Sequence, residues 1–311
     1  MFESLFYALD VTLPISLIII LGAVLKRIGW ITDAFAETGS RLVFNLTLPC
    51  LLFVNVSTTQ LDENLPLVML VVACVVATLA YIGLHFMAFL MPNQMARGAF
   101  VQGACRGNLA IVGFALSLSA FGEEALSVAS MYLAVLVLPV NVFSILTLYY
   151  HQAKSPSLRT IGWNVLSNPL AIAIMLALIV ALLQIQVPAL IMKTGDYLAR
   201  MTLPLALLCV GASIRWYEFK VSRLLYLAMS FKLVLLPAVA VAIGYLWGLT
   251  GTELGVLFMM MAAPTAAAAY PMVRSIGGDY HLTAAIIAGS TLFSMFTSTL
   301  GLFVLRYMQW V

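Results

Sequence analysis

The sequence predicts an all-α polytopic membrane protein with ten transmembrane helices, arranged as two inverted five-helix repeats. Three observations carry this prediction: a strongly apolar composition, ten separate apolar stretches of spanning length, and matching residues in the two halves. Hydrophobic residues make up 63% of the chain and charged residues 9%, and the mean hydropathy is +1.08. A water-soluble core of 311 residues cannot bury so much apolar surface, so lipid must cover most of the molecule.

A helix that crosses a bilayer needs about 20 apolar residues, and charges, glycines and turn residues divide the chain into such stretches. The expected spans are residues 5–25, 37–57, 66–90, 98–120, 125–149, 162–184, 190–213, 222–247, 253–274 and 281–306. The fourth and ninth are weaker than the others because polar residues, glycines or prolines interrupt them. The longest polar stretch, 151–160, predicts a cytoplasmic linker between a first repeat over 1–150 and a second over 161–311.

The two halves match at an offset of about 155 residues. At this offset Pro14 corresponds to Pro169, Thr47-Leu48-Pro49 to Thr202-Leu203-Pro204, and Gly122 to Gly277. A repeat with an odd number of helices enters the membrane from the opposite side in its second copy, which produces inverted repeats. Chance alignment of two apolar sequences is the alternative interpretation.

The basic residues predict the orientation, because short cytoplasmic loops collect Lys and Arg. We expect a multi-pass protein of the cell membrane with both termini outside. The inner loops then carry Lys26, Arg27, Arg97, Lys154, Arg159, Arg215, Lys220, Arg223 and Arg274, and the outer side carries Asp62, Glu63, Glu123, Glu124 and Glu253. The net charge of +3 is small, and we expect no nucleic-acid partner.

The fourth and ninth spans contain the two interruptions. Residues 106–113 read RGNLAIVG, and Pro264-Thr265 is followed by four alanines, Tyr270 and Pro271. Unpaired backbone at membrane depth is tolerated only in a protein interior or a hydrated cavity, so we expect the two breaks to meet and line one. Each broken helix presents a half-helix N-terminus there, and two such ends favour an anion.

The candidate substrate-binding residues follow from these breaks. They are Arg106, Gly107, Asn108, Gly113, Asn141, Asn45, Arg200, Pro264 and Thr265. Asn108 offers an amide, Thr265 a hydroxyl, and Asn141 a hydrogen bond to the first break. Arg106 either pairs with a substrate carboxylate or extends toward the membrane surface, and the equivalent positions Asn45 and Arg200 form either a substrate-facing pair or a structural one.

Two more charged residues lie within the expected spans. Asp10 is a candidate for ion or proton coupling, with a salt bridge as the alternative, and Lys232 either shares that role or neutralises nearby helix C-termini. We expect no metal or cofactor, because the four cysteines lack CxxC spacing and histidine partners. An enzyme is not expected either, since no HExxH motif, paired carboxylates or Ser/His/Asp set falls at membrane depth.

The segment Arg106–Asn108, Leu48-Pro49, Asn141 and Pro264-Thr265-Ala266 resemble the auxin efflux carrier family, which includes plant PIN auxin exporters and bacterial malonate-type permeases. The resemblance covers essentially the whole chain. It implies a fold similar to NhaA-type antiporters and bile acid symporters, with helices 1, 2, 6 and 7 as a scaffold. Helices 3–5 and 8–10 would form the transport domain, in which helices 4 and 9 cross and Asn108 and the helix 9 break line the site. A homodimer through the scaffold helices is also implied.

These observations predict an elevator-type secondary transporter that moves a small organic anion, a carboxylate such as malonate or an auxin-like acid. One alternative is a sodium- or proton-coupled importer resembling bile acid symporters. Another is a membrane sensor that binds a ligand without net transport. This sequence departs from the family pattern at Ala268, where related bacterial permeases often have asparagine.

Overall fold

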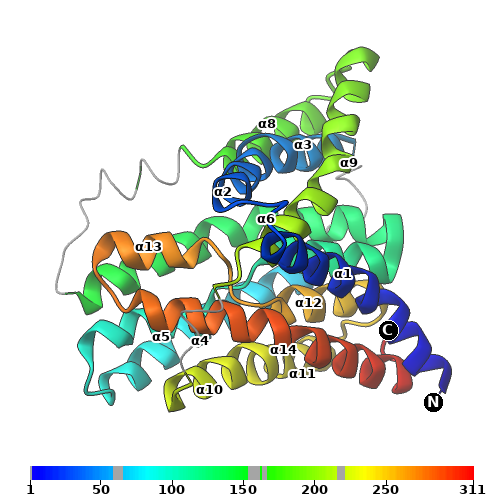
Figure 1. Ribbon diagram of the computed structural model, residues 1–311. Coiled ribbons are helices and arrows are strands. Elements are labelled where there is room, and N and C mark those ends of the chain that lie inside the picture. Colours follow the sequence, from blue (N-terminus) through cyan, green and yellow to red (C-terminus); the bar gives the residue numbers. More distant parts are fainter. Residues whose placement is uncertain (1, 59–65, 153–161, 163–166, 216–220) are drawn as a thin grey trace.

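The computed structural model describes residues 2–58, 66–152, 162, 167–215 and 221–311 (Figure 1). Within this part the elements are α1 (Phe2–Arg27), α2 (Asp33–Leu42), η1 (Val43–Thr47), α3 (Leu48–Thr58), α4 (Leu67–Phe89), α5 (Gln94–Cys105), η2 (Leu109–Gly113), α6 (Phe114–His151), α8 (Pro169–Leu182), α9 (Ala189–Ala212), α10 (Arg223–Ser230), η4 (Phe231–Leu235), α11 (Leu236–Leu246), α12 (Gly251–Ala262), α13 (Ala269–Ile276) and α14 (Tyr280–Tyr307). The η elements are short π-helical turns.

The protein is an all-α polytopic membrane protein. Six helices of the described part are long and apolar enough to cross a membrane: Phe2–Arg27, Asp33–Thr58, Leu67–Phe89, Leu109–His151, Arg223–Leu246 and Tyr280–Tyr307. Two shorter apolar helices, Pro169–Leu182 and Gly251–Ala262, accompany them. Most of the linker predicted at 151–160 lies outside the described residues, as do Asp62, Glu63, Lys154, Arg159 and Lys220 of the orientation argument.

Helix α1 shows why the sequence needs lipid. Its buried positions, including Ala8, Val11, Ile15 and Ile19, recur every three or four residues and form one inward stripe. The opposite side is equally apolar, because Leu13, Leu17 and Leu21 are exposed. A helix that is hydrophobic all round is stable only when its outer face meets hydrocarbon.

The helices gather in two groups. In Figure 1, α2, α3, α8 and α9 lie together in the upper part, and α4, α5 and α10 to α14 lie in the lower part. Helix α1 packs on α9 of the first group, on α14 of the second and on α6. Two glycines allow the close approach of α1 and α9: a Cβ on Gly22 would lie 2.2 Å from the Leu208 carbonyl oxygen, and one on Gly211 would lie 1.9 Å from that of Ile19.

Two glycines matched by the repeat offset share an unusual backbone. Gly122 has φ 59° and interrupts α6, and Gly277 has φ 91° and ends α13. This left-handed region carries a steric cost for every residue with a Cβ, which explains glycine at both positions. The prolines Pro14 and Pro169 do not share an environment, because Pro14 lies inside α1 whereas Pro169 is in the first turn of α8.

The sixth expected span, 162–184, is not one continuous helix, because residues 167 and 168 are not helical. Helix α8 begins at Pro169, after Asn168 in extended conformation. The Asn168 side-chain oxygen accepts hydrogen bonds from the amides of Leu170 at 2.9 Å and Ala171 at 3.4 Å. Asparagine at the N-cap followed by proline at the first helical position is a strong start signal, and the apolar run before it concealed that signal.

Candidate functional site

The two predicted interruptions are both present, and they lie in contact. Gly107 and Thr265 form an antiparallel bridge. The Asn108 amide donates to the Pro264 carbonyl at 2.6 Å, and the Ala266 amide donates to the Arg106 carbonyl at 3.0 Å. Each break therefore satisfies backbone groups that the other leaves without a helical partner, which makes non-helical backbone tolerable at this depth.

The first break is short and restarts at once. Arg106 ends α5 with φ −79° and ψ 97°, and the Asn108 carbonyl then accepts from Val112 at 3.0 Å and Gly113 at 3.1 Å. These bonds begin the π-helical turn η2, a geometry that is enriched at functional sites. Gly113 lets η2 approach α12, because a Cβ there would lie 3.0 Å from the Met260 sulfur and 3.3 Å from the Ala263 Cβ.

The second break follows from Pro264. Proline has no amide hydrogen and forces the preceding residue out of the helical region, and Ala263 accordingly has φ −55° and ψ 138°. Thr265 is 1% exposed. Its amide donates to the Ser290 hydroxyl at 3.0 Å, and its own hydroxyl donates to the Gly103 carbonyl at 2.6 Å. Thr265 thus joins the second break to α5 and α14.

Arg106 is partly buried, and its guanidinium contacts two neighbouring side chains. One guanidinium nitrogen donates to the Asn141 Oδ1 atom at 2.8 Å, and the other contacts the Met272 sulfur. Asn141 therefore bonds to the first break, as predicted. In the part of the chain that the structure describes, Arg106 has no carboxylate partner, because the ion pairs there are Lys26–Asp33, Arg41–Glu37 and Arg200–Asp196.

Lys232 lies on the other side of the same break. It is 1% exposed, and its Nζ atom donates to the Met261 carbonyl at 2.8 Å. Met261 is close to the C-terminus of α12, so the ammonium sits at a helix C-terminus, as one of the two interpretations of this residue expected. A Cβ on Gly107 would lie 3.0 Å from Nζ, which shows how closely the lysine approaches the first break.

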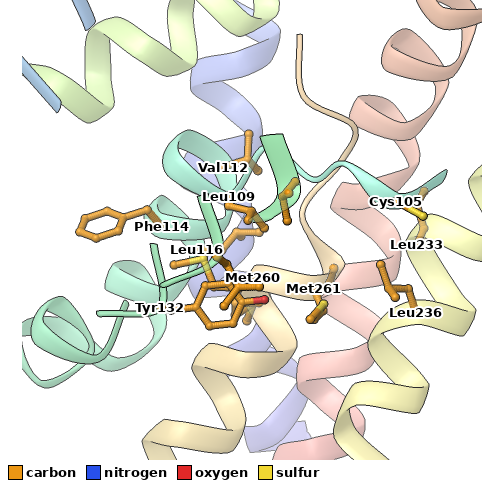
Figure 2. Packing of buried hydrophobic residues seen from close by; sticks show 14 of the residues in the cluster. Cys105, Leu109, Val112, Phe114, Leu116, Tyr132, Leu233, Leu236, Met260 and Met261 are labelled. Carbon is orange, nitrogen blue, oxygen red and sulfur yellow. The ribbon is translucent and has the colours of Figure 1, made fainter. Parts of the chain in front are cut away.

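A small cavity borders these groups. Its walls include Cys105, Gly107, Tyr132, Lys232 and Met261, and its free volume is about 20 Å³. That is room for about one water molecule. Its apolar lining comes from α4, α5, η2, α6, α11 and α12. Figure 2 shows buried apolar side chains from most of these helices packed together, so charged groups beside the cavity lie in a surrounding of low polarity.

Asn108 is 7% exposed, and its side-chain amide makes no hydrogen bond within the described part of the chain. It is a donor and acceptor that the fold itself does not use. Among the candidates, Arg106, Gly107, Asn108, Gly113, Asn141, Lys232, Pro264 and Thr265 are thus brought to the two breaks or into contact with them.

The remaining candidates lie on exposed helix surfaces. Asn45 donates to the Arg41 carbonyl, and Arg200 pairs with Asp196 at 2.8 Å, so both side chains bond within their own helices. Among the described residues, neither side chain contacts the two breaks, and the two make no hydrogen bond to each other. Asp10 is exposed on α1, and no hydrogen bond or ion pair of the described residues includes its side chain.

Sequence reasoning missed three neighbours of the breaks. Ser290 on α14 accepts from Thr265, and Met272 on α13 contacts Arg106. Gln102 is fully buried, and its Oε1 atom has no partner among the described residues. Gln102 carried a usable signal, because it is a polar side chain one helical turn before Arg106. Ser290 and Met272 carried none, since serine and methionine are ordinary in membrane helices.

Comparison with known families gives one family model, which matches the chain at two places. The model of the family described as membrane transport protein matches residues 7–161 and again residues 154–302. Together the two matches span nearly the whole chain, including both breaks, Asn141 and Lys232.

Three curated relatives are similar along almost their full length. An uncharacterized transporter of Methanocaldococcus jannaschii is 24% identical over 315 residues, covering 97% of this chain and 98% of the relative. The uncharacterized transporter YfdV of Escherichia coli is 22% identical, covering 94% and 96%. An uncharacterized transporter of Methanothermobacter thermautotrophicus is 24% identical, covering 92% and 94%.

Proposed function

Because the chain belongs to the membrane transport protein family, of the auxin efflux carrier type, we propose that it is a secondary transporter of a small organic anion. The substrate would be a carboxylate such as malonate or an auxin-like acid. It would bind where the two breaks meet.

The observation that carries the proposal is the charge of Arg106, which no carboxylate of the described residues pairs. A guanidinium at membrane depth costs about 2.5 to 3.5 kcal/mol on insertion scales, and its partners here are neutral, an amide oxygen and a thioether. Lys232 adds a second cation, which is buried and bonds to a backbone carbonyl. A substrate carboxylate supplies the counterion that the described residues do not, and a guanidinium matches its geometry with two parallel hydrogen bonds.

The backbone supports the same sign of charge. The helical segments that begin after the breaks direct their N-termini inward, and a helix N-terminus carries roughly half a positive charge together with free amide donors. The Asn108 side-chain amide makes no hydrogen bond to a described residue, and in this proposal it hydrogen-bonds the bound carboxylate or its substituent.

The proposed mechanism is elevator-type alternating access across ten transmembrane helices in two inverted five-helix repeats. The scaffold would comprise α1, α2, α3, α8 and α9, and the remaining helices would form the moving domain; the two groups of Figure 1 support this division. A cavity of about 20 Å³ does not hold a dicarboxylate, so the cycle must include a more open state. We further propose a homodimer through the scaffold and both termini outside.

The test is uptake of radiolabelled mono- and dicarboxylates, including malonate and indole-3-acetate, into liposomes that contain the purified protein. The proposal expects saturable uptake of at least one carboxylate, and no saturable uptake of matched cations or neutral amides. Imposed pH and sodium gradients show whether the flux is coupled. Saturable binding without flux would favour a sensor, and uptake of a cation instead of an anion would contradict the proposal.

A further inference from the structure

Lys232 is held by a carbonyl that an intact helix would have used. In a continuous helix the Met261 carbonyl would accept from the amide of Thr265, four residues later. Here the Thr265 amide donates to Ser290 at 3.0 Å instead. The Lys232 Nζ atom donates to the Met261 carbonyl at 2.8 Å and so replaces the missing helical hydrogen bond.

The same ammonium also borders the end of the other interrupted helix. Helix α5 ends at Cys105, and the position of a Cβ on Gly107 would be 3.0 Å from Nζ and 3.4 Å from the Lys232 Cε atom. Each helix C-terminus carries roughly half a negative charge. The two ends together therefore match one positive charge, which Lys232 supplies from a π-helical turn in the neighbouring helix.

An ammonium has three donors, and one of them bonds to Met261. In the described part of the chain Lys232 makes no second hydrogen bond, and it lines the cavity of about 20 Å³. The lysine thus fills a small, negatively polarised position between two helix ends, and space for about one water molecule remains beside it.

We propose that Lys232 is a tethered cation: its ammonium occupies a position that a free monovalent cation would otherwise fill, and it positions the two helix ends for anion binding. The inference rests on the proposed function for its transport readout. Because the lysine fills this position, transport by the natural protein needs no mobile cation there. The inference also gives a specific consequence, because removing the side chain creates a cation site where none existed.

The experiment compares Lys232→Ala with Lys232→Met. Alanine removes the charge and opens space, whereas methionine removes the charge and fills the space with a side chain of similar length. In liposomes with N-methylglucamine as the only cation, both variants should lose about tenfold or more of the carboxylate flux, the scale of a lost charged hydrogen bond. Ammonium, methylammonium or sodium should restore flux in Lys232→Ala and leave Lys232→Met unchanged. The natural protein should respond to none of them.

Thermal unfolding of the purified protein provides a readout that needs no substrate. The melting temperature of Lys232→Ala should rise with ammonium, methylammonium or sodium, in preference to N-methylglucamine, and those of the natural protein and Lys232→Met should not. The melting measurement can support the inference even if no carboxylate is transported. Failure of the inference can therefore be distinguished from failure of the proposed function.

Three outcomes would overturn the inference. They are a natural protein that responds to ammonium, methylammonium and sodium as Lys232→Ala does, full flux in Lys232→Met, and a Lys232→Ala variant that responds to no cation. If Lys232→Ala does not fold without cations, its yield with and without ammonium during purification replaces the melting measurement. Equal yields would then count against a tethered cation.

Discussion

The two breaks meet face to face, but they contribute different chemistry. The first break carries the guanidinium of Arg106 and the side-chain amide of Asn108, the two polar groups that the proposal assigns to the substrate. The second break carries Pro264 and Thr265, and the Thr265 hydroxyl is already engaged by the Gly103 carbonyl. The alanines that follow include the exposed Ala268, which offers no polar group.

The two breaks therefore have different roles. The second break shapes the crossing: its proline terminates α12, its threonine ties it to α5 and α14, and its carbonyl at Pro264 holds Asn108. The first break, with Asn141 and Lys232, supplies the charge. Substitutions in the first break should therefore change transport more than stability, and those in the second should do the reverse.

The largest effect should come from Asn141→Asp. The change is nearly isosteric and places a carboxylate where the Asn141 Oδ1 atom now accepts from Arg106 at 2.8 Å. A tethered carboxylate competes at an effective concentration far above that of a free substrate, so carboxylate flux should fall by roughly 100-fold. Flux in liposomes measures this, and the melting temperature should not decrease, because the new carboxylate pairs with the partly buried Arg106 cation.

The matched control is Asn141→Leu, which removes the hydrogen bond to Arg106 without adding a charge. It should lower flux by about tenfold or less, since only a neutral contact to the guanidinium is lost. Equal loss in the two variants would show that Asn141 acts through packing alone. Undiminished flux in Asn141→Asp would contradict the view that the substrate is the counterion of Arg106.

An intermediate effect, on stability, should come from Thr265→Val. Valine keeps the shape of threonine but leaves the fully buried Gly103 carbonyl without its side-chain donor at 2.6 Å. Loss of such a bond costs about 1–3 kcal/mol, which lowers the melting temperature by several degrees. Thr265→Ser keeps the hydroxyl and should recover most of that loss.

Substrate affinity per folded molecule should change little in Thr265→Val. Isothermal titration with whichever carboxylate is transported measures it. A large loss of affinity without a loss of stability would place the threonine hydroxyl on the substrate and would remove the contrast between the breaks.

The sequence predicted the class of protein and both interruptions because each has a local cause. Pro264 removes an amide donor and bends the residue before it, and Gly107 and Asn108 weaken the helix where they stand. That the breaks meet followed from a general argument about unpaired backbone in membranes. A hydrogen bond from Asn141 to the first break was also predicted, because an isolated amide in an apolar run needs a partner. That its partner is Arg106 was not predicted.

Other features depend on distant contacts and left no local trace. Ser290 became part of the site only because α14 passes the amide of Thr265. The start of α8 at Pro169 was missed because apolar residues precede the Asn168 cap. For Asn45 and Arg200, a repeat offset identifies equivalent positions but not the direction in which either side chain points.

Substitution of Asn45 and Arg200 should have the smallest effect on carboxylate transport. Arg200 is paired with Asp196 one helical turn away, and its side chain is 78% exposed; Asn45 bonds to the Arg41 carbonyl and is exposed as well. Pairs of this kind contribute about 0.3–0.5 kcal/mol on a helix surface. The double variant Asn45→Ala, Arg200→Ala should therefore transport carboxylates within about twofold of the natural protein. A loss comparable to that of Asn141→Leu would mean that another state of the cycle brings the pair to the substrate, and the recognition chemistry would then no longer belong to the first break alone.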